Sequence, residues 1–129
     1  MKKITKDWIH SAESDLLLIQ EIIFNQHLTH LAAFHAQQAI EKSFKAIIEE
    51  FELGFIKSHS LETLYSKVKE KISTDINIPQ LILLDQLYIE ARYLGEMGLL
   101  PDGKPTIQDV AAFYNLAKHV FETAQIACI

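Results

Sequence analysis

A chain of 129 residues with 49% hydrophobic and 22% charged residues is long enough for one domain with a buried core and too apolar for a disordered protein. Its net charge of −5 argues against nucleic-acid binding over the whole surface, although a local basic face stays compatible with that charge. Cys128 is the only cysteine, and no apolar run approaches the roughly 20 residues that a membrane-spanning helix needs. We expect one cytoplasmic domain over residues 1–129.

The first predicted element is an amphipathic helix over residues 4–24. Apolar residues recur there at steps of three and four, as on one face of a helix; they include Trp8, Ala12, Leu16, Ile19 and Ile23. Residues 25–27 form a short connection, in which Asn25 could adopt the left-handed conformation that ends many helices. Because the connection is short, we expect the next helix to run antiparallel to the first.

The second predicted helix covers about residues 28–53, ends at Gly54 and is the most informative part of the chain. Its apolar side carries Ala33, Ala36, Ile40, Phe44, Ile47 and Phe51, and its opposite side carries His35, Gln38, Lys42, Lys45 and Glu49. Gln37 and Glu41 lie one turn apart at the flank of the apolar side. A carboxylate that is partly removed from water needs a positively charged partner, so this helix predicts a cation elsewhere in the chain.

Two further helices follow before a long loop. Ser58 or Ser60 can cap a third helix, which carries Leu61, Leu64, Tyr65, Val68 and Ile72. Asn77 can cap a fourth, in which Pro79 is tolerated in the first turn. Residues 95–105 then hold three of the four glycines and two of the three prolines, which predicts a loop.

The last predicted helix begins near Thr106 and runs to about Ala127. Thr106 and Asp109 have the spacing of a capping box, with Asp in place of Glu. No segment shows the alternation of a β-strand. The sequence therefore predicts an all-α fold, an up-and-down antiparallel bundle of five helices with a core like that of a four-helix bundle.

Four motifs suggest a family. The longest is FHAQQAIEK at residues 34–42, followed by Lys45 and Ala46; the others are Trp8-x-x-x-Ala12-x-x-Asp15-Leu16, His59-Ser60-Leu61-x-x-Leu64 and Tyr88-x-x-x-Arg92-Tyr93. Together they cover nearly the whole chain and resemble the signature of the HEPN (higher eukaryotes and prokaryotes nucleotide-binding) domain family. The resemblance implies a helical bundle that commonly forms homodimers. It also implies a minimal nucleotidyltransferase as partner in a two-component, toxin–antitoxin-like system.

Many members of this family are metal-independent endoribonucleases, and their signature is an Arg followed, after four to six residues, by a His. Arg92 matches the Arg, but the next histidine is His119. The resemblance therefore implies a protein without the usual catalytic pair.

Arg92 is the predicted cation for Glu41. A pair between a guanidinium and a carboxylate could pin two helices together, or Arg92 could be shared with a phosphate-bearing ligand. In the second case Lys42, Lys45, His35 and His59 would supply further groups for an oxyanion. Tyr93, at the edge of the loop, could stack on a base.

Three functions remain open at this point. The leading hypothesis is a non-catalytic nucleotide- or RNA-related binding partner of a nucleotidyltransferase. The first alternative is an atypical endoribonuclease in which His35 or His59 supplies the acid–base group. The second is a structural assembly module without a ligand. His27-x-x-His30 has helix-face spacing but no carboxylate beside it, so we predict no metal site, and no motif predicts a cofactor.

Overall fold

The computed structural model describes residues 1–91 and 104–129, with side chains for residues 1–88 and 104–129. In these ranges the chain forms five α-helices and two short 3₁₀ helices and contains no strand, which confirms the all-α prediction. The elements are α1 (Lys3–Ile22), η1 (Gln26–Leu28), α2 (Thr29–Glu50), α3 (Leu61–Val68), η2 (Lys69–Lys71), α4 (Ile78–Ala91) and α5 (Ile107–Ala127).

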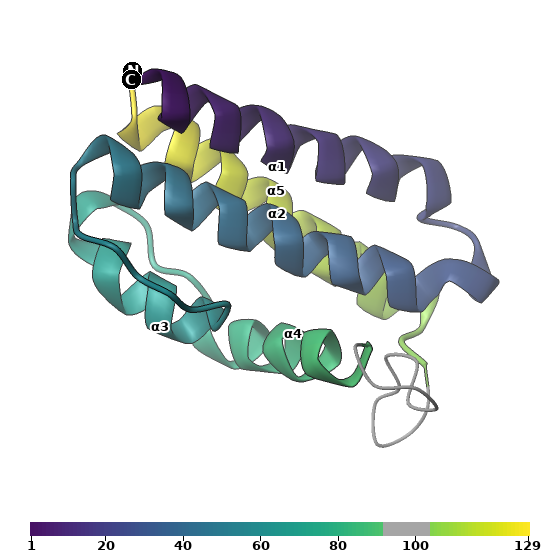
Figure 1. Ribbon diagram of the computed structural model, residues 1–129. Coiled ribbons are helices and arrows are strands. Elements are labelled where there is room, and N and C mark those ends of the chain that lie inside the picture. The colour runs from purple at the N-terminus through teal and green to yellow at the C-terminus, as the bar shows by residue number, and fades with distance from the viewer. Residues whose placement is uncertain (92–103) are drawn as a thin grey trace.

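The helices lie side by side around α2 (Figure 1). As predicted, α1 and α2 form an antiparallel pair. Helix α5 runs in the same direction as α2, whereas α4 runs opposite to it (Figure 1). Because α2 contacts α1, α3, α4 and α5, it is the central helix of the bundle.

Because α2 is the central helix, its predicted polar side is partly buried rather than fully exposed to solvent. The predicted apolar residues are buried, except Phe51, which lies beyond the end of the helix and is exposed. Ala39, Ser43 and Ala46, on the other sides, are also fully buried. Their small side chains let neighbouring helices come close. The two lysines and the histidine of the predicted polar side, Lys42, Lys45 and His35, are therefore half-buried rather than fully solvated.

The connection between α1 and α2 differs from the prediction at Asn25. Its φ of −92° is extended rather than left-handed, and its side chain accepts a hydrogen bond from the His27 N–H at 2.9 Å. Asn25 thus caps η1 instead of ending α1. Asn side chains make such local hydrogen bonds readily, and this one competes with a left-handed helix end.

Helix α2 ends at Glu50, earlier than predicted, in a Schellman motif. Leu53 N–H donates to Ile48 O at 3.0 Å and Glu52 N–H donates to Glu49 O at 3.3 Å. This motif places its left-handed residue at Glu52, with a φ of 53°. Gly54, the predicted stop, is also left-handed, with a φ of 100°, but it lies two residues further along.

The later caps follow the sequence closely. Ser60 accepts the Thr63 N–H, Asn77 accepts the Gln80 N–H, and Thr106 and Asp109 form the complete capping box. Helix α3 ends at Val68, before Ile72, because η2 tightens its last turn. Most of the predicted loop lies outside the described residues; Lys104 and Pro105 belong to the described part.

Within residues 1–91 and 104–129, no helix combines the length and the apolar character that crossing a membrane requires.

Candidate functional site

Glu41 lies in a buried hydrogen-bonded network at the surface of α2. Its side chain is 6% exposed. Lys45 Nζ lies 3.0 Å from Oε2, and His59 Nδ1 lies 3.1 Å from Oε1 and 3.2 Å from Oε2. Gln37 Nε2 donates to Oε1 at 3.3 Å. Glu41 is therefore buried as predicted and has a cation, which Lys45 supplies one turn further along the same helix.

The predicted partner of Glu41 is Arg92. Arg92 and Tyr93 both lie outside the described residues. The pairing of Glu41 with Arg92 therefore stays a prediction, alongside the observed contacts with Lys45 and His59.

His59 is held in place from two helices. Its carbonyl oxygen accepts a hydrogen bond from Gln37 Nε2 at 3.1 Å, which ties it to α2. Two residues later, the Leu61 N–H donates to both carboxylate oxygens of Asp85 on α4, at 2.9 and 3.0 Å. Burial raises the pKa of Asp85, and the negative charge of Glu41 adds to this. The segment before α3 is thus fixed between α2 and α4.

A second buried carboxylate, Asp15 of α1, forms a matching network. Asp15 is 7% exposed. His35 Nδ1 lies 2.8 Å from its Oδ1, and Lys42 Nζ lies 2.8 Å from its Oδ2. Asp15 is not among the predicted site residues. The available signal was an acidic residue beside Leu16 at the apolar spacing of the first helix.

An aromatic pair lies between the two histidines. The rings of Phe34 and Tyr88 are stacked, with centroids 5.6 Å apart and an interplanar angle of 12°. Phe34 also contacts the His35 ring edge-on at 5.3 Å, and Tyr88 contacts the His59 ring at 5.8 Å. These contacts join the Asp15 and Glu41 networks into one face, the histidine face, made of His35, Lys42, Lys45, His59, Phe34 and Tyr88. Neither Phe34 nor Tyr88 is among the predicted site residues.

A pocket of about 170 Å³ adjoins the Glu41 end of this face. Lys45 and His59 line it, with Trp8, whose ring lies 5.5 Å from Lys45 Nζ. Lys57 and Ser58, from the segment between α2 and α3, also line it. The pocket thus combines ammonium, hydroxyl and imidazole groups with an aromatic ring.

The chemistry of the histidine face follows from how its imidazoles are held. In both histidines Nδ1 faces a buried carboxylate, which orients the ring and leaves Nε2 for another partner. The His59 side chain is 58% exposed, whereas that of His35 is 25% exposed. When a histidine is protonated, its network holds two positive charges against one negative charge, so the face then gains attraction for oxyanions.

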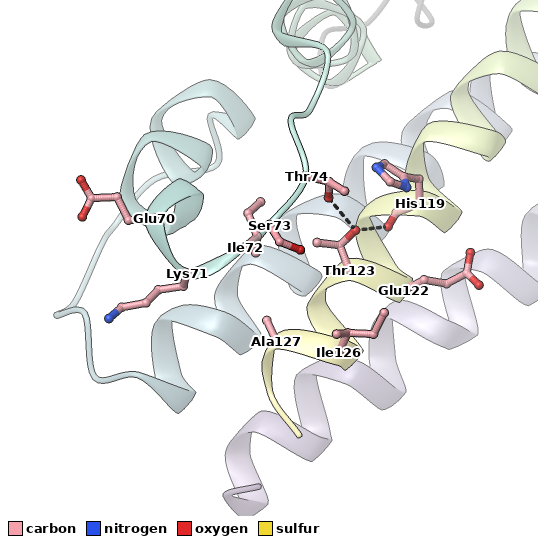
Figure 2. Close-up of a pocket in the computed structure, with 10 residues that line it drawn as sticks. All are labelled: Glu70, Lys71, Ile72, Ser73, Thr74, His119, Glu122, Thr123, Ile126 and Ala127. Atoms are coloured by element: carbon pink, nitrogen blue, oxygen red, sulfur yellow. Dashed lines mark hydrogen bonds between the residues drawn. The ribbon is translucent and has the colours of Figure 1, made fainter.

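A larger pocket lies elsewhere. It has a volume of about 570 Å³ and lies between the segment after α3 and the C-terminal half of α5 (Figure 2). Figure 2 shows the Thr74 hydroxyl beside that of Thr123, which in turn donates to the His119 carbonyl oxygen. Of the predicted site residues that the structure describes, none lines this pocket. Its polar groups are exposed or bonded locally, so we do not assign it a role.

Among the described residues, no three His, Cys, Asp or Glu side chains come together in a way that could hold a metal ion.

Comparisons with known proteins agree with the architecture. The chain shares 22% identity and a TM-score of 0.68 with the crystal structure of an archaeal HEPN homologue, over 100% of both chains. A likeness at this identity concerns the fold. A search of curated proteins gave no significant match. The sequence model of the HEPN domain matches residues 5–127, which is nearly the whole chain. The chain therefore belongs to the HEPN domain family.

Proposed function

We propose that this protein is a non-catalytic nucleotide- or RNA-related binding partner of a minimal nucleotidyltransferase in a two-component, toxin–antitoxin-like system. Membership of the HEPN family supports this proposal, together with the absence of a histidine four to six residues after Arg92. The homodimer that the resemblance implies and the cytoplasmic location expected from the composition belong to the same proposal.

The observation that carries the proposal is the construction of the histidine face. Two buried carboxylates, Asp15 and Glu41, each hold one lysine and one histidine at the surface of α2. Fixed cations of this kind lose little side-chain entropy when a phosphate binds, which favours affinity. The stacked pair of Phe34 and Tyr88 lies between the histidines and offers an aromatic surface beside them, as proteins that bind single-stranded nucleic acids do.

Calorimetric titration with ATP and with a short single-stranded RNA tests the binding function. We expect binding to the wild-type protein and at least tenfold weaker binding after His59→Ala, because this change removes the more exposed imidazole while Glu41 keeps Lys45. His119→Ala, an exposed histidine on α5, is the matched control and should bind like wild type. If neither ligand binds, with or without the co-expressed nucleotidyltransferase, the structural assembly module becomes the better hypothesis.

One observation favours the ribonuclease as a second candidate. Nδ1 of both His35 and His59 faces a carboxylate, the arrangement that prepares an imidazole for proton transfer through Nε2. An RNA-cleavage assay in the presence of a chelator separates the two functions. Cleavage that is lost in both His35→Ala and His59→Ala, and in Arg92→Ala, would replace the non-catalytic proposal.

A further inference from the structure

The pocket beside the Glu41 end of the histidine face has room for one part of a ligand. Its volume is about 170 Å³, whereas pockets that enclose a whole small-molecule ligand have roughly 300–1,000 Å³. Lys45 and His59 of the histidine face form part of its wall. A ligand that enters this pocket with one group therefore has its remaining groups on or near the histidine face.

Two aromatic rings from different parts of the chain line this pocket. Trp8 belongs to α1 and is half-buried, whereas Phe55 belongs to the segment between α2 and α3 and is 90% exposed. Phe55 contacts no other ring of the described residues, and it also lines a neighbouring pocket of about 300 Å³. Both rings therefore offer an apolar surface on which a flat group could stack.

Positive groups at the edge of the pocket indicate that this flat group belongs to a polyanion. Lys45 and His59 are held by Glu41, and Lys57 adds an exposed ammonium that has no ion pair or hydrogen bond with a described residue. Aromatic rings beside cations are the combination by which proteins bind single-stranded nucleic acids. An apolar side chain of a protein partner would stack on the rings but would not use these cations.

One acidic side chain of the pocket distinguishes between bases. Glu49 lies one turn after Lys45 on α2 and is half-buried. Its carboxylate makes no ion pair or hydrogen bond with a described residue, so it lacks the donor that a partly desolvated carboxylate needs. The exocyclic amino group of cytosine or adenine is such a donor. Uracil has a carbonyl oxygen where cytosine has its amino group, and a carboxylate, which only accepts hydrogen bonds, disfavours that oxygen.

From these observations we propose that the pocket holds one base of a single-stranded RNA, a base with an exocyclic amino group, stacked on Trp8 and Phe55 and hydrogen-bonded to Glu49. The phosphates next to that base lie on the cations at the edge of the pocket. This inference rests on the proposed function, because it requires RNA to bind at the histidine face, and it adds the position and the kind of base.

Oligocytidylate and oligouridylate of equal length are matched probes, because their bases differ at the exocyclic group that faces Glu49. Trp8 is the only tryptophan of the chain, so its fluorescence reports on this pocket, while calorimetry measures the affinity. We expect oligocytidylate to quench the Trp8 fluorescence and to bind at least about fivefold more tightly than oligouridylate.

Phe55→Ala tests the stacking surface in a variant that keeps the fold, because this side chain is almost fully exposed. We expect it to weaken oligocytidylate binding by about fivefold to 150-fold. Phe24→Ala is the matched control, since Phe24 is 83% exposed and follows the other end of α1, and it should bind like wild type. Inorganic tripolyphosphate, which carries the charges without a base, should bind wild type and Phe55→Ala equally.

Glu49→Gln tests the choice of base. A glutamine amide can both donate and accept, so this variant should lose the preference for oligocytidylate over oligouridylate. Glu21→Gln, at an exposed glutamate of α1 outside this pocket, should keep the preference.

The outcomes separate this inference from the proposed function. If RNA binds but Phe55→Ala binds oligocytidylate like wild type and Trp8 is not quenched, the base pocket is wrong and the proposed function stands. Equal affinity of wild type for the two oligonucleotides also overturns the inference. If neither oligonucleotide binds in calorimetry, both proposals fail. If Phe55→Ala weakens binding of the nucleotidyltransferase but not of RNA, the pocket holds a protein side chain, and the inference is overturned.

Discussion

Asp15 and Glu41 are both buried, and each holds a lysine and a histidine of the histidine face. In each network one oxygen contacts an ammonium and the carboxylate contacts an imidazole Nδ1. Such pairs are not strongly stabilising when compared with apolar residues, because both charges lose water. Removing one partner is costly, since the remaining charge is left half-buried. We therefore expect these carboxylates to be sensitive positions in both stability and binding.

Asp15→Asn should lower the free energy of unfolding by about 2 kcal/mol, because Lys42 and His35 then face a neutral amide. The loss is expected to stay below that of a fully buried pair, because both side chains keep some contact with water and can rehydrate. Urea unfolding measures it. Asp7→Asn, on the same helix, breaks the exposed pair with Lys3 and should cost less than about 0.5 kcal/mol. An equal decrease in the free energy of unfolding in the two variants would show that the buried network stabilises the fold no more than the exposed pair does.

The lowered pKa of His30 predicts how the free energy of unfolding depends on pH. Burial, and then the charge of Lys104, lowers the pKa of His30 below its ordinary value of 6.5. Below pH 6.5 the unfolded chain therefore binds this proton before the folded chain does, so its contribution to stability is present at neutral pH and is lost on acidification. His30→Gln should show a smaller decrease in unfolding free energy between neutral pH and pH of about 5 than wild type. An unchanged pH dependence in this variant would contradict the assignment.

At the scale of single elements, the helix caps are the features that the local sequence predicts best. The Asn77 and Thr106 caps were readable from residue type and spacing, and the third was narrowed to Ser58 or Ser60, because a capping side chain acts within three residues of its own position. The end of α2 was not readable in this way. Glu52, rather than a glycine, occupies the left-handed position of the Schellman motif. A residue with a Cβ is strained there.

Glu52→Gly should raise the free energy of unfolding by about 0.5–1 kcal/mol, because glycine adopts the left-handed conformation without a Cβ clash. The ion pair with Lys2 that is lost involves a Glu52 side chain that is 83% exposed, so its contribution is small. Glu52→Ala removes the same ion pair but keeps the backbone strain, and it should not stabilise. Chemical denaturation of the three proteins provides the comparison, and a stabilised alanine variant would count against strain as the cause.

At the scale of the whole molecule, the two chain ends and the end of α2 come together. Figure 1 draws the N- and C-termini at the same end of the bundle, and the charge of the N-terminal amino group acts on Cys128. The Lys2 N–H donates to Glu50 Oε1 at 3.0 Å, and Thr5 Oγ1 donates to the same oxygen at 2.9 Å. Cys128 is buried in this region and is 1% exposed. These contacts hold the two chain ends and the end of α2 together. The reactivity of the Cys128 thiol therefore reports whether this end of the bundle is packed.

Burial, together with the charge of Glu50, raises the pKa of Cys128 to about 11 from an ordinary value of 9.0. Because the thiolate is the reactive form, this shift alone should slow reaction with Ellman's reagent at pH of about 8 by roughly 100-fold, and burial should slow it further. The rate should keep rising with pH beyond 9. The same protein in denaturant is the control and should react at the rate of an ordinary thiol. Fast reaction of the native protein would show that this end of the bundle opens readily.

The sequence by itself determined the five helices, most of their caps, the family signature and the burial of Glu41. These features depend on spacing along one helix or on side chains that act within a few residues, so they can be read without coordinates. Only the tertiary structure decided which groups meet Glu41 and Asp15. His59 reaches Glu41 from a segment 18 residues away, and Asp15 reaches Lys42 from the neighbouring helix, 27 residues away.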